Sequence, residues 1–127
     1  KQLEFALTHV TGSYGENYFS YVNGQHTNDG GTHQSAFKEG ILKGINEYFK
    51  KNWAPQDVRE GVVGAIAVKI KEPVFESQTK NKLSNTEIRT WIVNEVKDAI
   101  IDFLLKNTAE AEKINQKFST MRSFAKN

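Results

Sequence analysis

The clearest pattern along the chain is a change between two-residue and helical spacing of the apolar positions. Apolar and polar residues alternate over 3–10, which predicts a first strand with one buried face. The aromatic segment 18–22 predicts a second strand. The glycine-containing turn between them indicates an antiparallel hairpin. Residues 23–31 are expected to form a polar loop.

From Thr32 the apolar residues recur at helical spacing, which predicts a helix to about Lys51. Gly40 and Gly44 lie inside this helix, where each glycine costs up to about 1 kcal/mol relative to alanine. Two glycines one turn apart therefore indicate that another element packs closely against that face.

Alternation returns at 62–70 and predicts a third strand. Gly64, Ala65 and Ala67 are small residues at positions where a solvated strand usually carries polar side chains. They indicate a strand that is covered on both faces. Such a strand is expected to lie in the centre of its sheet.

A second long helix is predicted to begin near Ser84. Ser84 and Glu87 have the spacing of a capping box. Asn107 and Thr108 interrupt the helical pattern, and a third helix is expected to follow, packed on its own domain or on a partner helix. The predicted buried stripe of the second helix comprises Ile88, Trp91, Ile92, Val96, Ala99, Ile100, Phe103 and Leu104.

Composition is typical of one globular domain. The chain has 127 residues, of which 38% are hydrophobic and 25% charged. No apolar run reaches the ~20 residues that cross a bilayer, so no membrane partner is expected. The lack of cysteine excludes disulfides and thiol catalysis, and with three histidines no metal site is predicted.

The charge pattern leaves two interpretations open. A net charge of +2 is too small to indicate nucleic-acid binding by itself. Basic residues outnumber acidic ones from Lys106 onward. This excess suits either a solvated helix face or a DNA contact.

Two polar loops are candidates for binding. The first, Asn28-Asp29-Gly30-Gly31-Thr32-His33, leads into the first helix. Glycines at a helix N-terminus leave amide donors available to an anion. The alternative is a structural role, with Asp29 or Thr32 capping the helix.

The second polar loop, at 76–82, follows the predicted central strand. Gln78 can donate a hydrogen bond, and Lys80 and Lys82 carry ammonium groups that suit phosphate oxygens. A solvated loop is the other interpretation. From residue chemistry alone, the chain is an α+β domain whose role is open.

Three segments, at 26–33, 57–61 and 73–83, resemble a single family when they are taken together in order and spacing. They are similar to the second domain of the ATPase subunit of bacterial type IIA DNA topoisomerases, that is, of the B subunits of DNA gyrase and topoisomerase IV. The similarity covers nearly the whole chain. His26-Thr27 and the segment 75–78 look more like topoisomerase IV than gyrase.

The resemblance implies a particular α+β fold for residues 1–107. This is a transducer domain like domain 2 of ribosomal protein S5, a small sheet backed by helices with an unusual left-handed βαβ crossover. Residues 108–127 would begin a helix that leads toward the metal-binding, DNA-cleaving half of the subunit. Asp29, Gly30, Gly31, Thr32 and His33 would give structural support at the start of the first helix.

The resemblance also implies a role for the second loop. Gln78 and Lys80 would bind the γ-phosphate of ATP held in a preceding ATPase domain, and Lys80 would assist catalysis and sense the phosphate. ATP and Mg²⁺ would be cofactors of the full subunit. This chain alone would bind neither and would be inactive.

The implied partners are the preceding ATPase domain, the topoisomerase A subunit, DNA and a second B subunit. ATP binding would close a dimer gate around a DNA segment for strand passage, in the bacterial cytoplasm at the nucleoid. A stand-alone nucleic-acid-binding module with an S5-like fold is the alternative hypothesis. Such a module would bind nucleic acid with a steep salt dependence.

Overall fold

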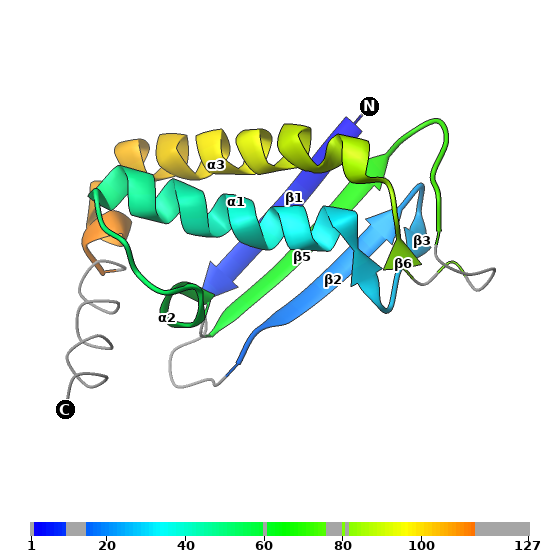
Figure 1. Cartoon of the computed structure of the whole chain (residues 1–127). Coiled ribbons are helices and arrows are strands. Elements are labelled where there is room, and N and C mark those ends of the chain that lie inside the picture. Colours follow the sequence, from blue (N-terminus) through cyan, green and yellow to red (C-terminus); the bar gives the residue numbers. More distant parts are fainter. Residues whose placement is uncertain (1, 10–14, 60, 76–79, 81, 114–127) are drawn as a thin grey trace.

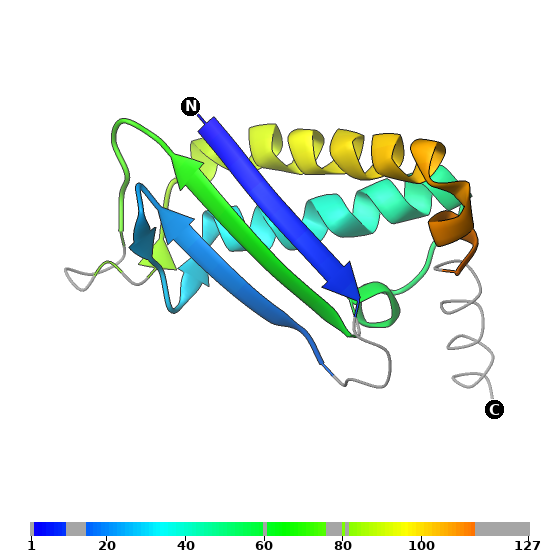
Figure 2. The same cartoon turned by 180° about the vertical axis from the view of Figure 1, so that it is seen from behind.

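The computed structural model describes residues 2–9, 15–59, 61–75, 80 and 82–113. These residues form two layers, a four-stranded sheet and two long helices that cover one of its faces (Figures 1 and 2). None of the helices in the described part of the chain has the length and apolar character of a membrane span.

The sheet is built around its third long strand. Its order is β1 (Gln2–His9), β5 (Val62–Lys69), β2 (Asn17–Val22) and β3 (Gln25–His26). β5 pairs antiparallel with β1 and parallel with β2. The predicted central position of this strand is confirmed.

The predicted hairpin between the first two strands is wrong, because β5 lies between β1 and β2. β5 is the most apolar of the three strands. Between two neighbours it forms a full ladder on each side and keeps its own edges away from water, which a β1–β2 hairpin would prevent. The ladder partner of β1 therefore lies more than fifty residues away, beyond the reach of a local pattern.

The expectation that β5 is covered on both faces is also wrong. Both long helices pack on the same side of the sheet (Figure 2), so burial alternates along β5. Ala65 and Ala67 are partly exposed on the open face, where neighbouring Phe19 is 48% exposed. Gly64 faces the helices instead, against the ring of Phe37.

The predicted polar loop at 23–31 contains two short strands. β3 returns antiparallel along the end of β2. β4 (Gly30–Gly31) pairs in parallel with β6 (Lys82–Leu83), far along the chain. Strands of two residues are too short to show a two-residue period in the sequence.

The connection from β2 to β5 runs through α1 (Thr32–Phe49) and the short helix α2 (Pro55–Arg59). The long helix agrees with the prediction, whereas α2 falls in a segment that was expected only to turn. In Figure 1, with the parallel strands directed upward and α1 in front, β5 lies to the left of β2. The crossover is therefore left-handed, against the common rule and as the resemblance implies.

The close neighbour indicated by Gly40 and Gly44 is α3 (Arg89–Lys106). A Cβ atom on Gly40 would lie 2.7 Å from Cβ of Val96, and one on Gly44 would lie 3.1 Å from Cβ of Ile100. The two helix backbones approach closely because these glycines have no side chain. This contact locks α1 and α3 into one layer.

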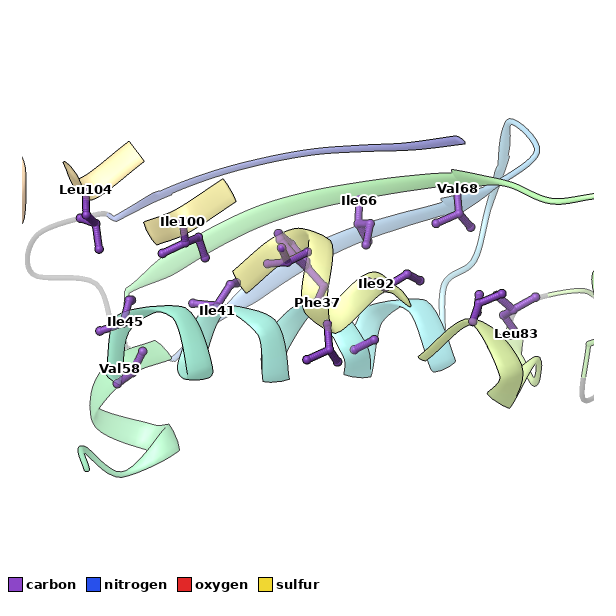
Figure 3. Packing of buried hydrophobic residues seen from close by; sticks show 14 of the residues in the cluster. Phe37, Ile41, Ile45, Val58, Ile66, Val68, Leu83, Ile92, Ile100 and Leu104 are labelled. Carbon is purple, nitrogen blue, oxygen red and sulfur yellow. The ribbon is translucent and has the colours of Figure 1, made fainter. Parts of the chain in front are cut away.

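The core lies between this helical layer and the sheet (Figure 3). Phe37 of α1 is fully buried at its centre. Its ring centroid is 5.5 Å from that of Phe5 on β1 and 5.9 Å from that of Tyr18 on β2. One aromatic side chain thus ties α1 to both flanking strands.

The buried stripe of α3 is shifted from the predicted one. Phe103 is 51% exposed, and Ala99 is exposed as well. Val93, which was not predicted to be buried, is only 4% exposed. At Gly40, α3 presents Val93 and Val96 to α1. Ala99 and Phe103 lie on another side of α3, where they border a hollow together with residues of β1.

The predicted capping box is wrong. A 3₁₀ turn, η1 (Thr86–Ile88), precedes α3, and no described side chain caps either helical segment. The Ser84 amide donates to the carbonyl of Val74, and the Glu87 carboxylate accepts from the side chain of Asn85. The Ser84 N–H and the Glu87 carboxylate, which a capping box would bring together, therefore have other partners.

The helical pattern breaks where it was expected to. Asn107 ends α3, with its side chain donating to the carbonyl of Phe103. Residues 108–113 are helical again, and Ala111 is buried against the core. The other apolar positions of the predicted third helix, from 114 onward, lie outside the described residues.

The helix contact predicts the effect of adding one methyl group. Gly40→Ala is expected to lower the free energy of unfolding by about 1–3 kcal/mol, because overpacking outweighs the gain in helix propensity. Gly44→Ala, with its looser contact, is expected to cost less. Val96→Ala removes the Cγ1 atom that the new methyl group would meet at 2.9 Å, so the double variant should lose less stability than the two single variants together. Urea denaturation of the parent and of each variant measures the free energy of unfolding. A Gly40→Ala variant as stable as the parent would contradict the close approach of α1 and α3.

Candidate functional site

The two loops singled out in the sequence meet at one end of the molecule. Lys80 is exposed and lies two residues before β6, with a left-handed backbone φ of 58°. Its carbonyl accepts a hydrogen bond from Nε2 of Gln25 on β3, at 3.4 Å. Gln78, the second predicted phosphate contact, lies outside the described residues.

Gly30 and Gly31 of the first loop form β4, the strand that pairs with β6. Gly30 lies opposite Lys82, and Gly31 opposite Leu83. Gly31 has a φ of 117°, and a Cβ atom there would overlap the backbone nitrogen and carbonyl oxygen of Leu83. Only glycine fits this conformation and this approach. Thr32 adds a hydrogen bond of 3.4 Å from its hydroxyl to the Leu83 carbonyl.

Neither residue proposed as a cap of the first helix has that role. The N-cap position of α1 is Gly31, and no described side chain caps it. A polar hollow lies beside this helix start, bordered by Asp29, Lys38 and Arg89 among others. Lys38 is paired with Glu16, and Arg89 with a carboxylate of α1.

A buried polar network lies beneath the glycine pair. His33 is fully buried, with Nε2 3.1 Å from the Thr27 hydroxyl. That hydroxyl donates to the carbonyl of Ser20 at 2.9 Å, and the Gly30 amide donates to the carbonyl of Thr27 at 3.0 Å. With the Thr27 proton directed at Ser20, Nε2 of His33 is the donor.

This tautomer leaves Nδ1 of His33 as a buried acceptor with no hydrogen-bond partner among the described residues. Burial lowers the pKa of His33 from 6.5 to about 4, because the imidazolium ion would lose its hydration. His33 is thus a neutral structural group. It connects α1 to the segment that carries Gly30.

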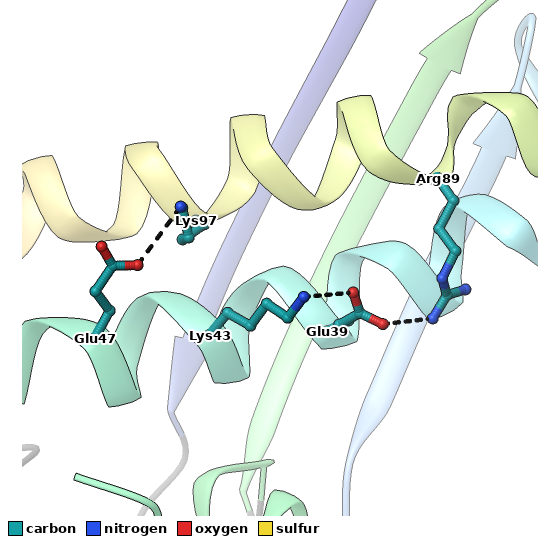
Figure 4. Close-up of polar contacts among 5 residues, drawn as sticks. All are labelled: Glu39, Lys43, Glu47, Arg89 and Lys97. Atoms are coloured by element: carbon teal, nitrogen blue, oxygen red, sulfur yellow. Dashed lines mark hydrogen bonds and ion pairs between the residues drawn. The ribbon is translucent and has the colours of Figure 1, made fainter. Parts of the chain in front are cut away.

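Ion pairs hold the outer surface of the helical layer (Figure 4). Glu39 of α1 accepts from Arg89 at 2.7 Å and lies 3.2 Å from Lys43. The hydrogen bond from Arg89 is the main reason that the pKa of Glu39 is lowered. Glu47 and Lys97 form a second bridge between α1 and α3, at 3.5 Å.

The remaining segment of the resemblance, at 57–61, lies away from Lys80. Its first residues belong to α2, and the Gly61 amide donates to the carbonyl of Gly15 at 2.8 Å. The side chains of Asp57 and Arg59 lie outside the described residues. Among the described residues, no cluster of three or more histidine and carboxylate side chains is placed to bind a metal.

Sequence comparison decides the family. A profile of the DNA gyrase B family matches residues 1–126. The chain belongs to the DNA gyrase B family. The B subunit of DNA topoisomerase 4 from Borreliella burgdorferi is 53% identical over 92% of the chain. The B subunit of DNA gyrase from Clostridium acetobutylicum is 40% identical over 83% of it. The matches span 19% and 18% of these two relatives, so the chain corresponds to about a fifth of their length.

Solved structures show the same fold within larger ATPase fragments. The 43K ATPase domain of Thermus thermophilus gyrase B, in complex with an aminocoumarin, superposes over 98% of the chain with a TM-score of 0.85 at 29% identity. The topoisomerase IV ATP-binding domain of Francisella tularensis gives the same TM-score at 30% identity. The chain covers 36% of each. The family and the fold implied by the three sequence segments are confirmed, and the stand-alone nucleic-acid-binding module is not supported.

The site also contains residues that sequence reasoning missed. Gln25 and Thr27 were assigned to a polar loop and given no role of their own. One contacts Lys80 and the other supports His33. Both act through tertiary contacts that leave no local periodic pattern. Thr27 lies within the 26–33 segment that carries the resemblance, which was the available clue.

Burial of His33 predicts a pH dependence of stability. The unfolded chain binds a proton at His33 below about pH 6.5, whereas the folded protein binds it only near pH 4. Stability is therefore full above pH 6.5 and falls as the pH drops toward 4, by up to about 3 kcal/mol from this group. The measurement is urea denaturation between pH 4.5 and 7.5.

His33→Gln is expected to flatten this pH dependence, even if it lowers stability overall. His26→Gln, which removes an exposed histidine, serves as the matched control and should keep the parent slope. Equal slopes for the His33→Gln variant and the parent would show that His33 is not the buried titrating group.

Proposed function

We propose that the chain is the transducer domain of the B subunit of an ATP-dependent type IIA DNA topoisomerase. In this role it senses the γ-phosphate of ATP and couples hydrolysis to gate closure and DNA strand passage. The main support is the pairing of β4 with β6, which joins the Gly-Gly-Thr-His motif and the strand after Lys80 into one unit. Family membership and the fold shared with gyrase and topoisomerase IV ATPase fragments support it further.

The chemistry of Lys80 suits a phosphate contact. Its ammonium group is on an exposed residue, so it is available to a ligand that is held by another domain. In phosphoryl transfer, a cation at the transferred group stabilises charge that grows in the transition state. Gln78 would donate a further hydrogen bond. The preceding ATPase domain would hold ATP and Mg²⁺, so this chain alone would be inactive.

The Asp29-Gly30-Gly31-Thr32-His33 motif would act as the support of this contact, without touching ATP. Gly31 allows the close approach to Leu83, and His33 fixes the segment from below. Because β6 begins two residues after Lys80, a change in phosphate occupancy at Lys80 can be passed to β4 and the start of α1. Such a transfer would reorient the transducer against the ATPase domain.

The proposed domain limits and partners follow from the same assignment. Residues 1–107 form the transducer, and 108–127 begin the helix toward the DNA-cleaving half of the subunit. The partners are the ATPase domain, the A subunit, DNA and a second B subunit, at the nucleoid in the bacterial cytoplasm. The higher identity to a topoisomerase IV relative than to a gyrase relative, 53% against 40%, favours topoisomerase IV.

Removal of the Lys80 ammonium group tests this function. In the full-length B subunit assembled with its A subunit, Lys80→Ala is expected to lower ATP turnover about 100-fold or more, in line with the loss of a transition-state contact. DNA strand passage should fall with it. A coupled ATPase assay and a relaxation assay measure the two activities.

Lys69→Ala is the matched control, because it removes an exposed lysine at the end of β5. It should leave both activities near the parent value. Unaltered ATP turnover in the Lys80→Ala protein would rule out the assigned role.

A further inference from the structure

A buried asparagine ties together the two ends of the segment that carries Lys80. Asn85 is only 4% exposed. Its Oδ1 accepts the backbone N–H of Val74, and its Nδ2 donates to the carbonyl of Glu72 at 3.0 Å and to Oε1 of Glu87 at 2.6 Å. Both hydrogens of the amide and its oxygen are engaged.

The two backbone groups that Asn85 binds belong to the residues on either side of Pro73. Proline has no N–H, so the chain that leaves β5 cannot continue a regular ladder at that point. Val74 is instead held at both of its backbone groups. Its carbonyl accepts the Ser84 amide at 2.6 Å, and its N–H is bound by Asn85. The Asn85 side chain therefore supplies the acceptor that a neighbouring strand would otherwise give to the Val74 N–H.

Val74 and Phe75 lie along the edge of β6 that is opposite to β4. Phe75 forms an antiparallel bridge with Leu83, so the entering and leaving ends of the segment are paired. On its other edge, β6 is paired with the glycine strand, and Gln25 holds the Lys80 carbonyl. β6, which begins two residues after Lys80, is thus held at both of its edges.

From these contacts we infer that Asn85 is a positioning residue for Lys80. It holds Glu72 and Val74 against the start of η1, and thereby sets the point at which the Lys80 segment leaves the fold. The Lys80 ammonium group then reaches the γ-phosphate in a fixed position. This inference rests on the proposed function, since it requires Lys80 to contact the nucleotide.

Asn85→Asp is the informative variant. Aspartate keeps the shape and the acceptor for Val74, but it loses the donors to Glu72 and Glu87. It also places a second carboxylate beside that of Glu87, where the two charges repel. The double variant Asn85→Asp, Glu87→Gln restores a donor at this contact and removes the repulsion, so it should recover much of the lost function.

The test uses the full-length B subunit assembled with its A subunit. Asn85→Asp is expected to lower kcat for ATP about tenfold or more, because a misplaced catalytic group costs this much. Binding of a non-hydrolysable ATP analogue should weaken, while binding of ADP, which lacks the γ-phosphate, should not change. In a Lys80→Ala background, Asn85→Asp should cause no further loss, because both changes remove the same contact.

Two controls separate positioning from general damage to the fold. Val96→Ala opens a cavity in the core near the middle of α3, and it is expected to lower the melting temperature without the selective loss of analogue binding. If Asn85→Asp does not fold, Val74→Pro tests the same side chain through its other bond, because it removes the N–H that Oδ1 of Asn85 accepts, on a residue that is 56% exposed. It should reproduce the loss of kcat and of analogue binding.

The inference is overturned if Asn85→Asp or Val74→Pro keeps the parent kcat, or if Asn85→Asp lowers activity equally in the Lys80→Ala background. Normal ATP turnover in Lys80→Ala alone would instead refute the proposed function. The two failures are therefore distinct.

Discussion

The parallel contact between Gly31 and Leu83 is the constraint on which the candidate site depends. It joins segments about fifty residues apart with only two residue pairs. It exists because Gly31 adopts a conformation with positive φ and has no side chain to collide with the backbone of Leu83. Through this contact the start of α1 and the segment after Lys80 become one structure. The glycine motif is thus explained by backbone geometry, with no need for a bound anion.

The rest of the fold provides a rigid frame for that contact. The close approach of α1 and α3 at Gly40 makes the helical layer stiff, and Phe37 connects this layer to the strands. His33 adds a buried polar link between α1 and Thr27. The start of α1 lies at the end of the sheet at which β2 and β5 finish (Figure 1). At that end β6, the strand that follows Lys80, is held by its pairing with β4 and by the hydrogen bond from Thr32.

The long elements could be predicted from the sequence because their periods are local properties. The helix from Thr32, the central strand at 62–70 and the glycine contact were all found in this way. The hairpin error arose because the pairing of β1 depends on β5, far along the chain. The two-residue strands, the roles of Gln25 and Asn85, and the neutral state of His33 depend on tertiary contacts. No spacing rule encodes such contacts. The family resemblance, at 26–33 and 73–83, pointed only to the segments beside Gln25 and Asn85.

The most direct test is a crystal structure of the full-length B subunit with a non-hydrolysable ATP analogue. We expect β4 and β6 to stay paired and Nζ of Lys80 to lie within about 3 Å of a γ-phosphate oxygen. A structure in which Lys80 faces solvent while another cation of the protein binds the γ-phosphate would contradict this expectation.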